Sequence, residues 1–243
     1  MTQMLASVAD LAEAEIAISG GADIVDLKDP RAGALGAVAT GLVREAVQAI
    51  GRRRLTSAVC GDLPMVPDAI RDTAGEVAAT GVDYVKIGFF PSPDAAACAE
   101  ALAPLSSRAE LIGVLFADRE PDFGLLDAFA RHGFCGAMVD TADKARGGLL
   151  DHLPPERIAD FIRRARSLGL KVGLSGSLAT PHIPRLLPFM PDFLGFRGAL
   201  CDRSRRTASI SRHAVDCVRA LIPQDTPYPA DVALSLAKRS LTQ

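Results

Sequence analysis

The stretch Gly20-Gly21-Ala22-Asp23-Ile24-Val25-Asp26-Leu27-Lys28 contains the pattern that decides the fold of this 243-residue chain. A helical pattern over residues 10–19 ends at the two glycines, and a short apolar run follows over residues 24–28. Glycine just past the end of a helix is an expected stop signal. A strand with nearly continuous apolar content indicates a parallel sheet that helices cover.

The same alternation of a short apolar run and a longer helical segment occurs eight times. We predict strands at residues 4–8, 24–28, 55–60, 84–89, 111–116, 136–141, 171–176 and 193–199. We predict helices at residues 10–19, 38–50, 67–80, 93–105, 123–132, 155–168, 180–189 and 206–221. This arrangement predicts an α/β fold, a single (β/α)8 TIM barrel over residues 1–222. A doubly wound open sheet is the alternative, but no Gly-x-Gly-x-x-Gly motif follows the first strand.

The composition narrows the classes of function. The net charge is −2 with no long basic stretch, which argues against a nucleic-acid partner. No apolar run approaches the roughly 20 residues that cross a bilayer, and no signal-peptide pattern is visible, so we expect no membrane partner. The five cysteines are scattered, which favours reduced thiols in a cytoplasmic enzyme. Residues 223–243 are expected to form a C-terminal tail with a short helix that packs on the barrel or on a neighbour.

The distribution of lysine suggests chemistry. The chain has five lysines against 22 arginines, and Lys28, Lys86 and Lys144 follow or interrupt apolar runs. Arginine supplies surface charge, whereas a desolvated lysine can lose its proton near neutral pH and attack a carbonyl. Lysines at strand ends in an arginine-rich chain are therefore candidates for catalysis.

Two aspartates accompany these lysines. Asp26 and Lys28 are two residues apart on one strand, so both point to the same face. Asp140 lies near the end of the sixth predicted strand, shortly before Lys144. A surface salt bridge at a strand end is the alternative for the first pair, and Lys86 could instead extend its amine to water at a sheet edge. Because alternate strands share a layer of a barrel interior, three amines and two carboxylates could converge on one cavity.

The seventh and eighth predicted strands end in glycine-rich turns. Such loops in barrels often bind phosphate, because glycine lets backbone N–H groups approach the anion. The candidate phosphate-binding residues are Ser175, Gly176, Ser177, Arg197 and Gly198. Plain tight turns are the alternative. The four histidines show no ligand spacing, so we expect no metal and no cofactor.

With these residues in place, the chain resembles the (5-formylfuran-3-yl)methyl phosphate synthase family of methanofuran biosynthesis, also described as 4-(hydroxymethyl)-2-furancarboxaldehyde-phosphate synthase. The resemblance covers most of residues 4–222. It rests on the runs Gly20–Pro30, Gly33-Ala34-Leu35-Gly36, Gly61-Asp62-Leu63-Pro64, Asp83-Tyr84-Val85-Lys86-Ile87-Gly88, Asp140-Thr141 with Lys144, and Phe196-Arg197-Gly198-Ala199. The Asp-x-Lys-x-Pro and Gly-x-Leu-Gly runs are the most specific part.

The resemblance implies a lyase that condenses two glyceraldehyde 3-phosphate molecules through a lysine Schiff base, with loss of phosphate and water. Carried over to this chain, Lys28 is the candidate for the imine, and Lys86 and Lys144 are proton donors or phosphate partners. Asp26 and Asp140 are then the general acid and base. A generic Schiff-base aldolase and a non-catalytic barrel that binds phosphorylated metabolites are the alternatives. A homo-oligomer is a further expectation, since barrels of this size often self-associate.

Overall fold

Eight parallel strands close into a barrel in the computed structural model, which describes residues 1–223. The strands are β1 (Gln3–Val8), β2 (Ile24–Leu27), β3 (Leu55–Val59), β4 (Tyr84–Phe89), β5 (Glu110–Phe116), β6 (Gly136–Asp140), β7 (Lys171–Leu174) and β8 (Phe193–Phe196). They follow one another in chain order, and β8 pairs with β1 to close the sheet. The predicted TIM barrel is therefore confirmed, and the open sheet is excluded.

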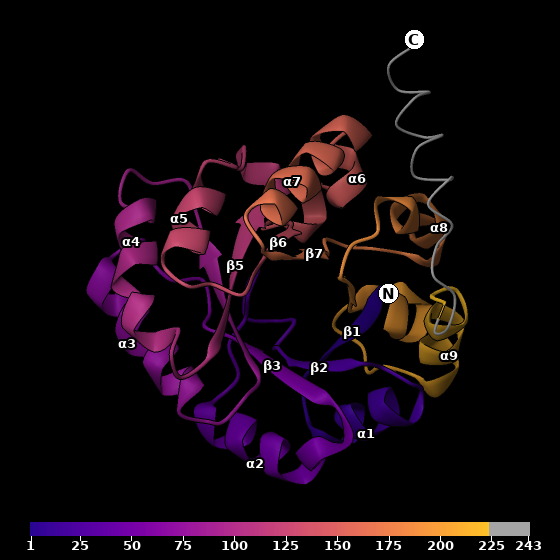
Figure 1. The fold of residues 1–243 in the computed structure, drawn as a ribbon. Coiled ribbons are helices and arrows are strands. Elements are labelled where there is room, and N and C mark those ends of the chain that lie inside the picture. The colour runs from indigo at the N-terminus through magenta and orange to yellow at the C-terminus, as the bar shows by residue number, and fades with distance from the viewer. Residues whose placement is uncertain (224–243) are drawn as a thin grey trace, which may run out of the picture.

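Helices surround the barrel on its outer side (Figure 1). They are α1 (Leu11–Ser19), α2 (Thr40–Ile50), α3 (Pro67–Ala78), α4 (Ala95–Ala101), α5 (Leu125–Arg131), α6 (Leu149–His152), α7 (Pro155–Ser167), α8 (Ile183–Leu186) and α9 (Arg212–Ala220). Most of the buried apolar side chains lie in one cluster between these helices and the strands, and a smaller cluster fills the barrel interior. This packing buries the near-continuous apolar strands on both faces.

Two predicted helices differ from the structure. The segment predicted at residues 180–189 is divided into three short pieces, because Pro181, Pro184 and Pro188 each lack the N–H that a continuous helix needs. The helix predicted from residue 206 begins only at Arg212, where the Ser211 side chain accepts a hydrogen bond from the N–H of Ala214. Residues 201–210 therefore form a loop after β8, which carries Arg206 to the barrel mouth.

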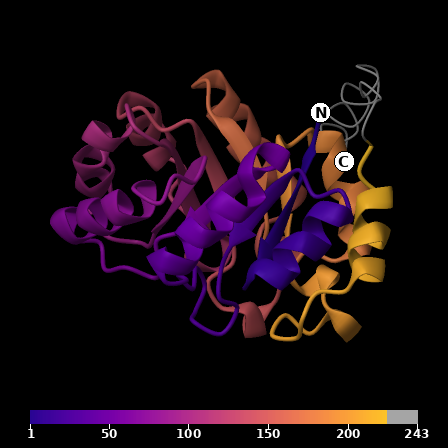
Figure 2. The ribbon, with the colours of Figure 1, turned by 90° about the horizontal axis from the view of Figure 1, so that it is seen from below.

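The carboxyl ends of all eight strands lie at one end of the barrel. In Figure 2 the orange loop that follows β8 projects from the lower edge, and the N-terminus lies at the upper edge. No helix within residues 1–223 is long and apolar enough to cross a membrane. The helix predicted in the tail falls on residues 224–243, outside the described residues.

Candidate functional site

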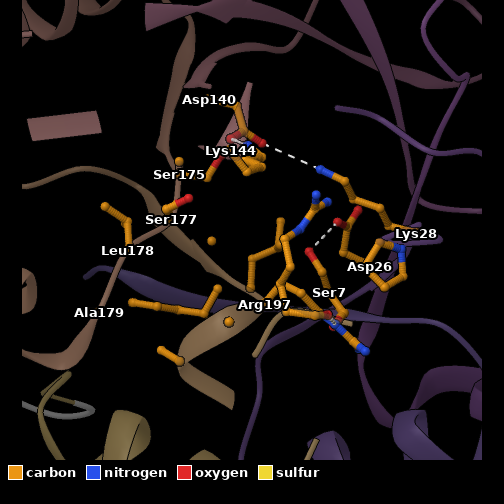
Figure 3. Close-up of a pocket in the computed structure, with 18 of the residues that line it drawn as sticks. Ser7, Asp26, Lys28, Asp140, Lys144, Ser175, Ser177, Leu178, Ala179 and Arg197 are labelled. Carbon is orange, nitrogen blue, oxygen red and sulfur yellow. Dashed lines mark hydrogen bonds and ion pairs between the residues drawn. The ribbon is translucent and has the colours of Figure 1, made fainter. Parts of the chain in front are cut away.

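A cavity of about 330 Å³ opens among the carboxyl ends of the strands. Residues of β1, β2, β4, β6 and β8 line it, together with residues of the loops after β2, β6, β7 and β8. All ten residues that the sequence nominated for catalysis or phosphate binding lie in this lining: Asp26, Lys28, Lys86, Asp140, Lys144, Ser175, Gly176, Ser177, Arg197 and Gly198. Figure 3 shows how the two labelled aspartates approach the cavity from opposite sides.

Asp26 lines the cavity and is fully buried. It is the register partner of Ser7 on β1 and of Ser57 on β3, so the three side chains point the same way. The two serine hydroxyls donate to its carboxylate oxygens at 2.8 and 2.6 Å. The fourth strand adds Lys86, whose Nζ lies 2.7 Å from Oδ1 of Asp26. Asp26 is therefore held by groups from three neighbouring strands.

Lys86 is a buried amine, with 3% of its side chain exposed. Burial lowers the pKa of Lys86, because water no longer solvates the cation. The negative charge of Asp26 opposes this effect, and the positive charge of Lys28 adds to it. An amine with a lowered pKa can exchange a proton closer to neutral pH than an ordinary lysine can.

Asp140 forms the second carboxylate site, at the end of β6. It accepts hydrogen bonds from Lys144 and, at 2.7 Å, from the N–H of Thr141. Burial alone would raise the pKa of Asp140, but the charges of Lys144 and Lys28 and the two hydrogen bonds outweigh it, so the pKa lies well below its usual range. Asp140 is therefore ionised at neutral pH.

The amines of Lys28 and Lys144 share this carboxylate unequally. Lys144 bonds to Asp140 and also to the side-chain oxygen of Thr141, at 3.0 Å. Lys28 lies 3.6 Å from Asp140, beyond hydrogen-bond distance, and its side chain is 9% exposed (Figure 3). Among the three lysines, Lys28 thus has the loosest ion pair. Its amine is the one that is least constrained by a protein partner.

This pairing differs from the arrangement that the sequence predicted. We expected Asp26 to lie beside Lys28, because both belong to the second strand and point to one face. The structure pairs Asp26 with Lys86 and Lys28 with Asp140 instead. A long lysine side chain carries its amine away from its own strand, so partners come from other strands, a relation that strand periodicity does not reveal.

The turn after β7 presents polar groups to the cavity. Gly176 and Ser177 both have positive φ, 111° and 49°, and their N–H groups have no hydrogen-bond partner within residues 1–223. The same holds for the N–H of Gly198 after β8. Gly195 on β8 leaves space in the cavity beside this turn. A Cβ at position 195 would lie 3.0 Å from Met138 Cε and 3.0 Å from Ser175 Cβ. Unpaired N–H groups beside a polar cavity can receive an anion.

Arg197 has a different position from the one expected of a phosphate ligand. Its guanidinium donates to both carboxylate oxygens of Glu13 and to the carbonyl oxygens of Ser7, Arg206 and Ala208. These contacts occupy all five of its N–H groups, so none is left for an anion in this structure. Arg197 instead holds the loop after β8 against Glu13 of α1.

Sequence reasoning missed Arg206, which it placed at the start of a helix. Arg206 lines the cavity and is half-buried, and its guanidinium makes one protein hydrogen bond within residues 1–223, a 3.4 Å contact to the carbonyl oxygen of Gly33. Burial lowers the pKa of its guanidinium, and the negative charge of Asp140 opposes that change. The signal for this residue was the basic run at residues 203–206, in the segment that follows the last strand. Arg206 has the free N–H groups that Arg197 lacks.

Within the described part of the chain, no group of three or more histidine, cysteine, aspartate and glutamate side chains is arranged to hold a metal ion. The buried thiol of Cys60 also lies outside the cavity lining. Burial raises the pKa of Cys60 to about 12, which disfavours the thiolate. The ionisable groups that face the cavity are therefore lysine, aspartate and arginine.

Solved structures of low sequence identity share the barrel. A phosphoribosyl anthranilate isomerase from Thermus thermophilus aligns with a TM-score of 0.65 and 15% identity, over 91% of this chain and 98% of that one. The KGPDC of Streptococcus mutans aligns with a TM-score of 0.63 and 13% identity, over 91% of this chain and 97% of that one. At such identities the likeness concerns the fold alone.

Proteins related by sequence give a more specific comparison than the shared barrel does. A (5-formylfuran-3-yl)methyl phosphate synthase of Methanopyrus kandleri is 34% identical over 88% of this chain and 95% of its own length. The synthase of the same name from Methanocaldococcus jannaschii is 33% identical over 90% and 98%. A Methylorubrum extorquens protein, provisionally given that name, is 40% identical over 90% and 92%. The family model described as 4-HFC-P synthase matches residues 4–219. The chain therefore belongs to the 4-HFC-P synthase family.

Proposed function

We propose that the protein is a lyase that joins two glyceraldehyde 3-phosphate molecules into (5-formylfuran-3-yl)methyl phosphate, a step of methanofuran biosynthesis. The atoms balance when one phosphate and two waters leave. The observation that carries the proposal is the convergence of three lysines and two aspartates on one cavity, with the amine of Lys28 in the loosest ion pair. The names of the relatives support the product.

Lys28 forms the imine in this scheme. Its neutral amine attacks the aldehyde carbon of one triose, and water leaves. The neutral amine is the form that attacks a carbonyl, and Lys28 has the loosest ion pair of the three lysines, so its amine is the one most easily released from its partner. Asp140, at 3.6 Å, is near enough to receive the proton that the amine gives up and to return it to the departing hydroxyl.

The imine then activates the adjacent carbon. It withdraws electrons from that carbon, so a base can remove its proton and leave an enamine. The electron pair of the enamine expels the phosphate on the next carbon and leaves an unsaturated iminium. The second triose, deprotonated at the carbon next to its own aldehyde, adds to the terminal carbon of this iminium and forms the new C–C bond, and water then releases Lys28. Lys86 and Asp26, a coupled pair in the cavity floor, are suited to move these protons. Ring closure and loss of water produce the aromatic furan.

Phosphate recognition belongs to the opposite wall. Ser175, Gly176, Ser177 and Gly198 line the cavity there, and the N–H groups of Gly176, Ser177 and Gly198 have no hydrogen-bond partner within residues 1–223. We add Arg206 to this set in place of Arg197, because its guanidinium has N–H groups that no protein acceptor occupies within residues 1–223. Arg206 can form a forked pair with a phosphate dianion.

The proposal is tested by incubating the purified protein with glyceraldehyde 3-phosphate. We expect a new ultraviolet absorbance from the conjugated furan aldehyde, with one inorganic phosphate released per product. Borohydride added during turnover should fix a triose-derived mass on Lys28, located by peptide mass spectrometry. An adduct without furan would indicate an ordinary Schiff-base aldolase, and binding without adduct or product would indicate a metabolite-binding barrel.

A further inference from the structure

The loop after β2 carries a wedge that closes one half of the barrel mouth. The wedge is the run Gly33-Ala34-Leu35-Gly36, which the lysine chemistry does not use. Leu35 is 1% exposed and belongs to the small apolar cluster inside the barrel, together with Val59 and Phe116. Leu35 does not itself line the cavity; it fills part of the barrel mouth next to the cavity.

The contacts of Leu35 place it above Lys86. Its Cδ1 lies 2.8 Å from where a Cβ of Gly88 would be, and the ring of Phe116 lies 3.1 Å from the same point. Gly88 and Lys86 are two residues apart on β4, so both face the barrel interior, with Gly88 nearer to the mouth. Glycine at position 88 is therefore what lets Leu35 enter.

The shape of the cavity agrees with this position. Both β3 and β5 lie wholly in the described chain, yet neither contributes a residue to the cavity lining. The mouth above these strands is filled by Leu35 and by Phe116, whose ring stacks on Phe90 at 4.4 Å. The open part of the cavity consequently lies toward β6, β7, β8 and β1, and the lysine side chains of β4 and of the loop after β2 reach into it.

Asp62 fixes the wedge in place. Its two carboxylate oxygens accept hydrogen bonds from the N–H groups of Ala34 and Leu35, at 2.7 and 2.8 Å. Gly33 has φ of 100°, and a Cβ there would lie 2.3 Å from Asp62 Oδ2. At Gly36 a Cβ would lie 2.1 Å from the carbonyl oxygen of Asp29. Both glycines thus allow the close approach that the wedge requires.

We propose that Leu35, held by Asp62, is a specificity-determining residue that limits the chain length of the carbonyl substrates to three carbons. This inference rests on the proposed synthase reaction. A longer aldehyde would extend from the lysines toward β3 and β5, where the wedge leaves no room. Removing the leucine side chain opens that half of the mouth.

The test supplies glyceraldehyde 3-phosphate and erythrose 4-phosphate in equal amounts and measures condensation products by mass spectrometry. In Leu35→Ala we expect the ratio of seven-carbon to six-carbon product to rise by about tenfold or more over the unaltered protein, since pocket discrimination of a single carbon is of that size. If the alanine variant does not fold, the same product ratio is measured in Leu35→Val, which removes less of the side chain. Asp62→Asn should raise the ratio as well, because its amide replaces one acceptor with a donor.

Asp83→Asn is the matched control. Asp83 is an exposed carboxylate that accepts two hydrogen bonds from Thr56, at 2.6 and 2.8 Å, at the opposite end of the barrel. It should lower stability as Asp62→Asn does and leave the product ratio unchanged. An unchanged ratio in folded Leu35 and Asp62 variants that still form six-carbon product would overturn the inference. Absence of the six-carbon product from the unaltered protein would instead count against the synthase reaction itself.

Discussion

The two carboxylates of the cavity hold their lysines in different ways. Asp26 is fully buried and is bonded by two serines and by Lys86, whereas Asp140 lies nearer to the mouth and is shared by two amines. Every partner of Asp26 lies within 2.8 Å, while Lys28 stays 3.6 Å from Asp140. A reacting amine has to leave its ion-pair partner, so the looser site is suited to covalent chemistry. The tighter site is suited to stabilising the fold and to proton transfer.

The largest effect should come from the loosest amine. Lys28→Arg retains the charge beside Asp140 but has no deprotonatable amine at neutral pH, so we expect the rate of furan formation to fall by on the order of 10⁴-fold or more. The furan absorbance measures the rate, and borohydride should no longer fix an adduct at position 28. Full activity in this variant would assign the imine to another lysine, with Lys86 the first to examine.

Asp140→Asn tests the carboxylate of the same site. The amide keeps the size of the side chain but cannot accept the proton of the Lys28 amine. We expect kcat to fall by about 10²- to 10⁴-fold, the range typical for loss of a general acid or base. A change confined to KM would show that Asp140 only helps to bind substrate. Circular dichroism should verify that the barrel is intact.

The deep site should lose stability as well as rate, and its effect on stability is the one that tests the ion pair. Lys86→Met leaves Asp26 as a buried carboxylate without its cation, and Asp26→Asn leaves the Lys86 cation without its anion. Each change should cost about 3–5 kcal/mol of unfolding free energy, and the double variant should cost clearly less than the sum, because neither charge then remains unpaired. Urea unfolding of the four proteins measures this coupling. Strictly additive costs would contradict a direct pair.

A smaller effect is expected at the support of the mouth site. Asp118, after β5, accepts hydrogen bonds from the N–H groups of Ala142 and Asp143, at 2.6 and 2.8 Å, and so holds the loop that carries Lys144. Asp118→Asn replaces one of these acceptors with a donor, which should displace the loop and lower kcat by about tenfold. Unchanged kinetics in a folded variant would show that Lys144 does not need this support.

The Asp26 and Asp140 sites also show which features of the structure could be predicted from the sequence and which could not. The strands and helix stops follow from local periodicity and glycine, so the barrel and the candidate lysines were accessible from the chain alone. Their partners were not, since Asp26 and Lys86 meet across the barrel interior. Arg197 and Arg206 differ in the same way: both follow β8, but only the folded loop determines which guanidinium is already occupied by Glu13 and backbone carbonyls.

The smallest effect concerns how the unfolding free energy changes in acid. It tests whether the lysines stabilise the charged form of Asp140 in the folded protein. Because the pKa of Asp140 is lowered by its lysines, the folded protein binds fewer protons there than the unfolded chain, whose aspartates titrate near about 3.9. The resulting stability is fully present above that pH and is lost as the pH falls toward the lower pKa of the folded state. Unfolding free energies measured between about pH 3 and 7 should therefore fall more steeply in acid for the unaltered protein than for Asp140→Asn. Equal slopes would mean that the lysines do not stabilise the Asp140 anion.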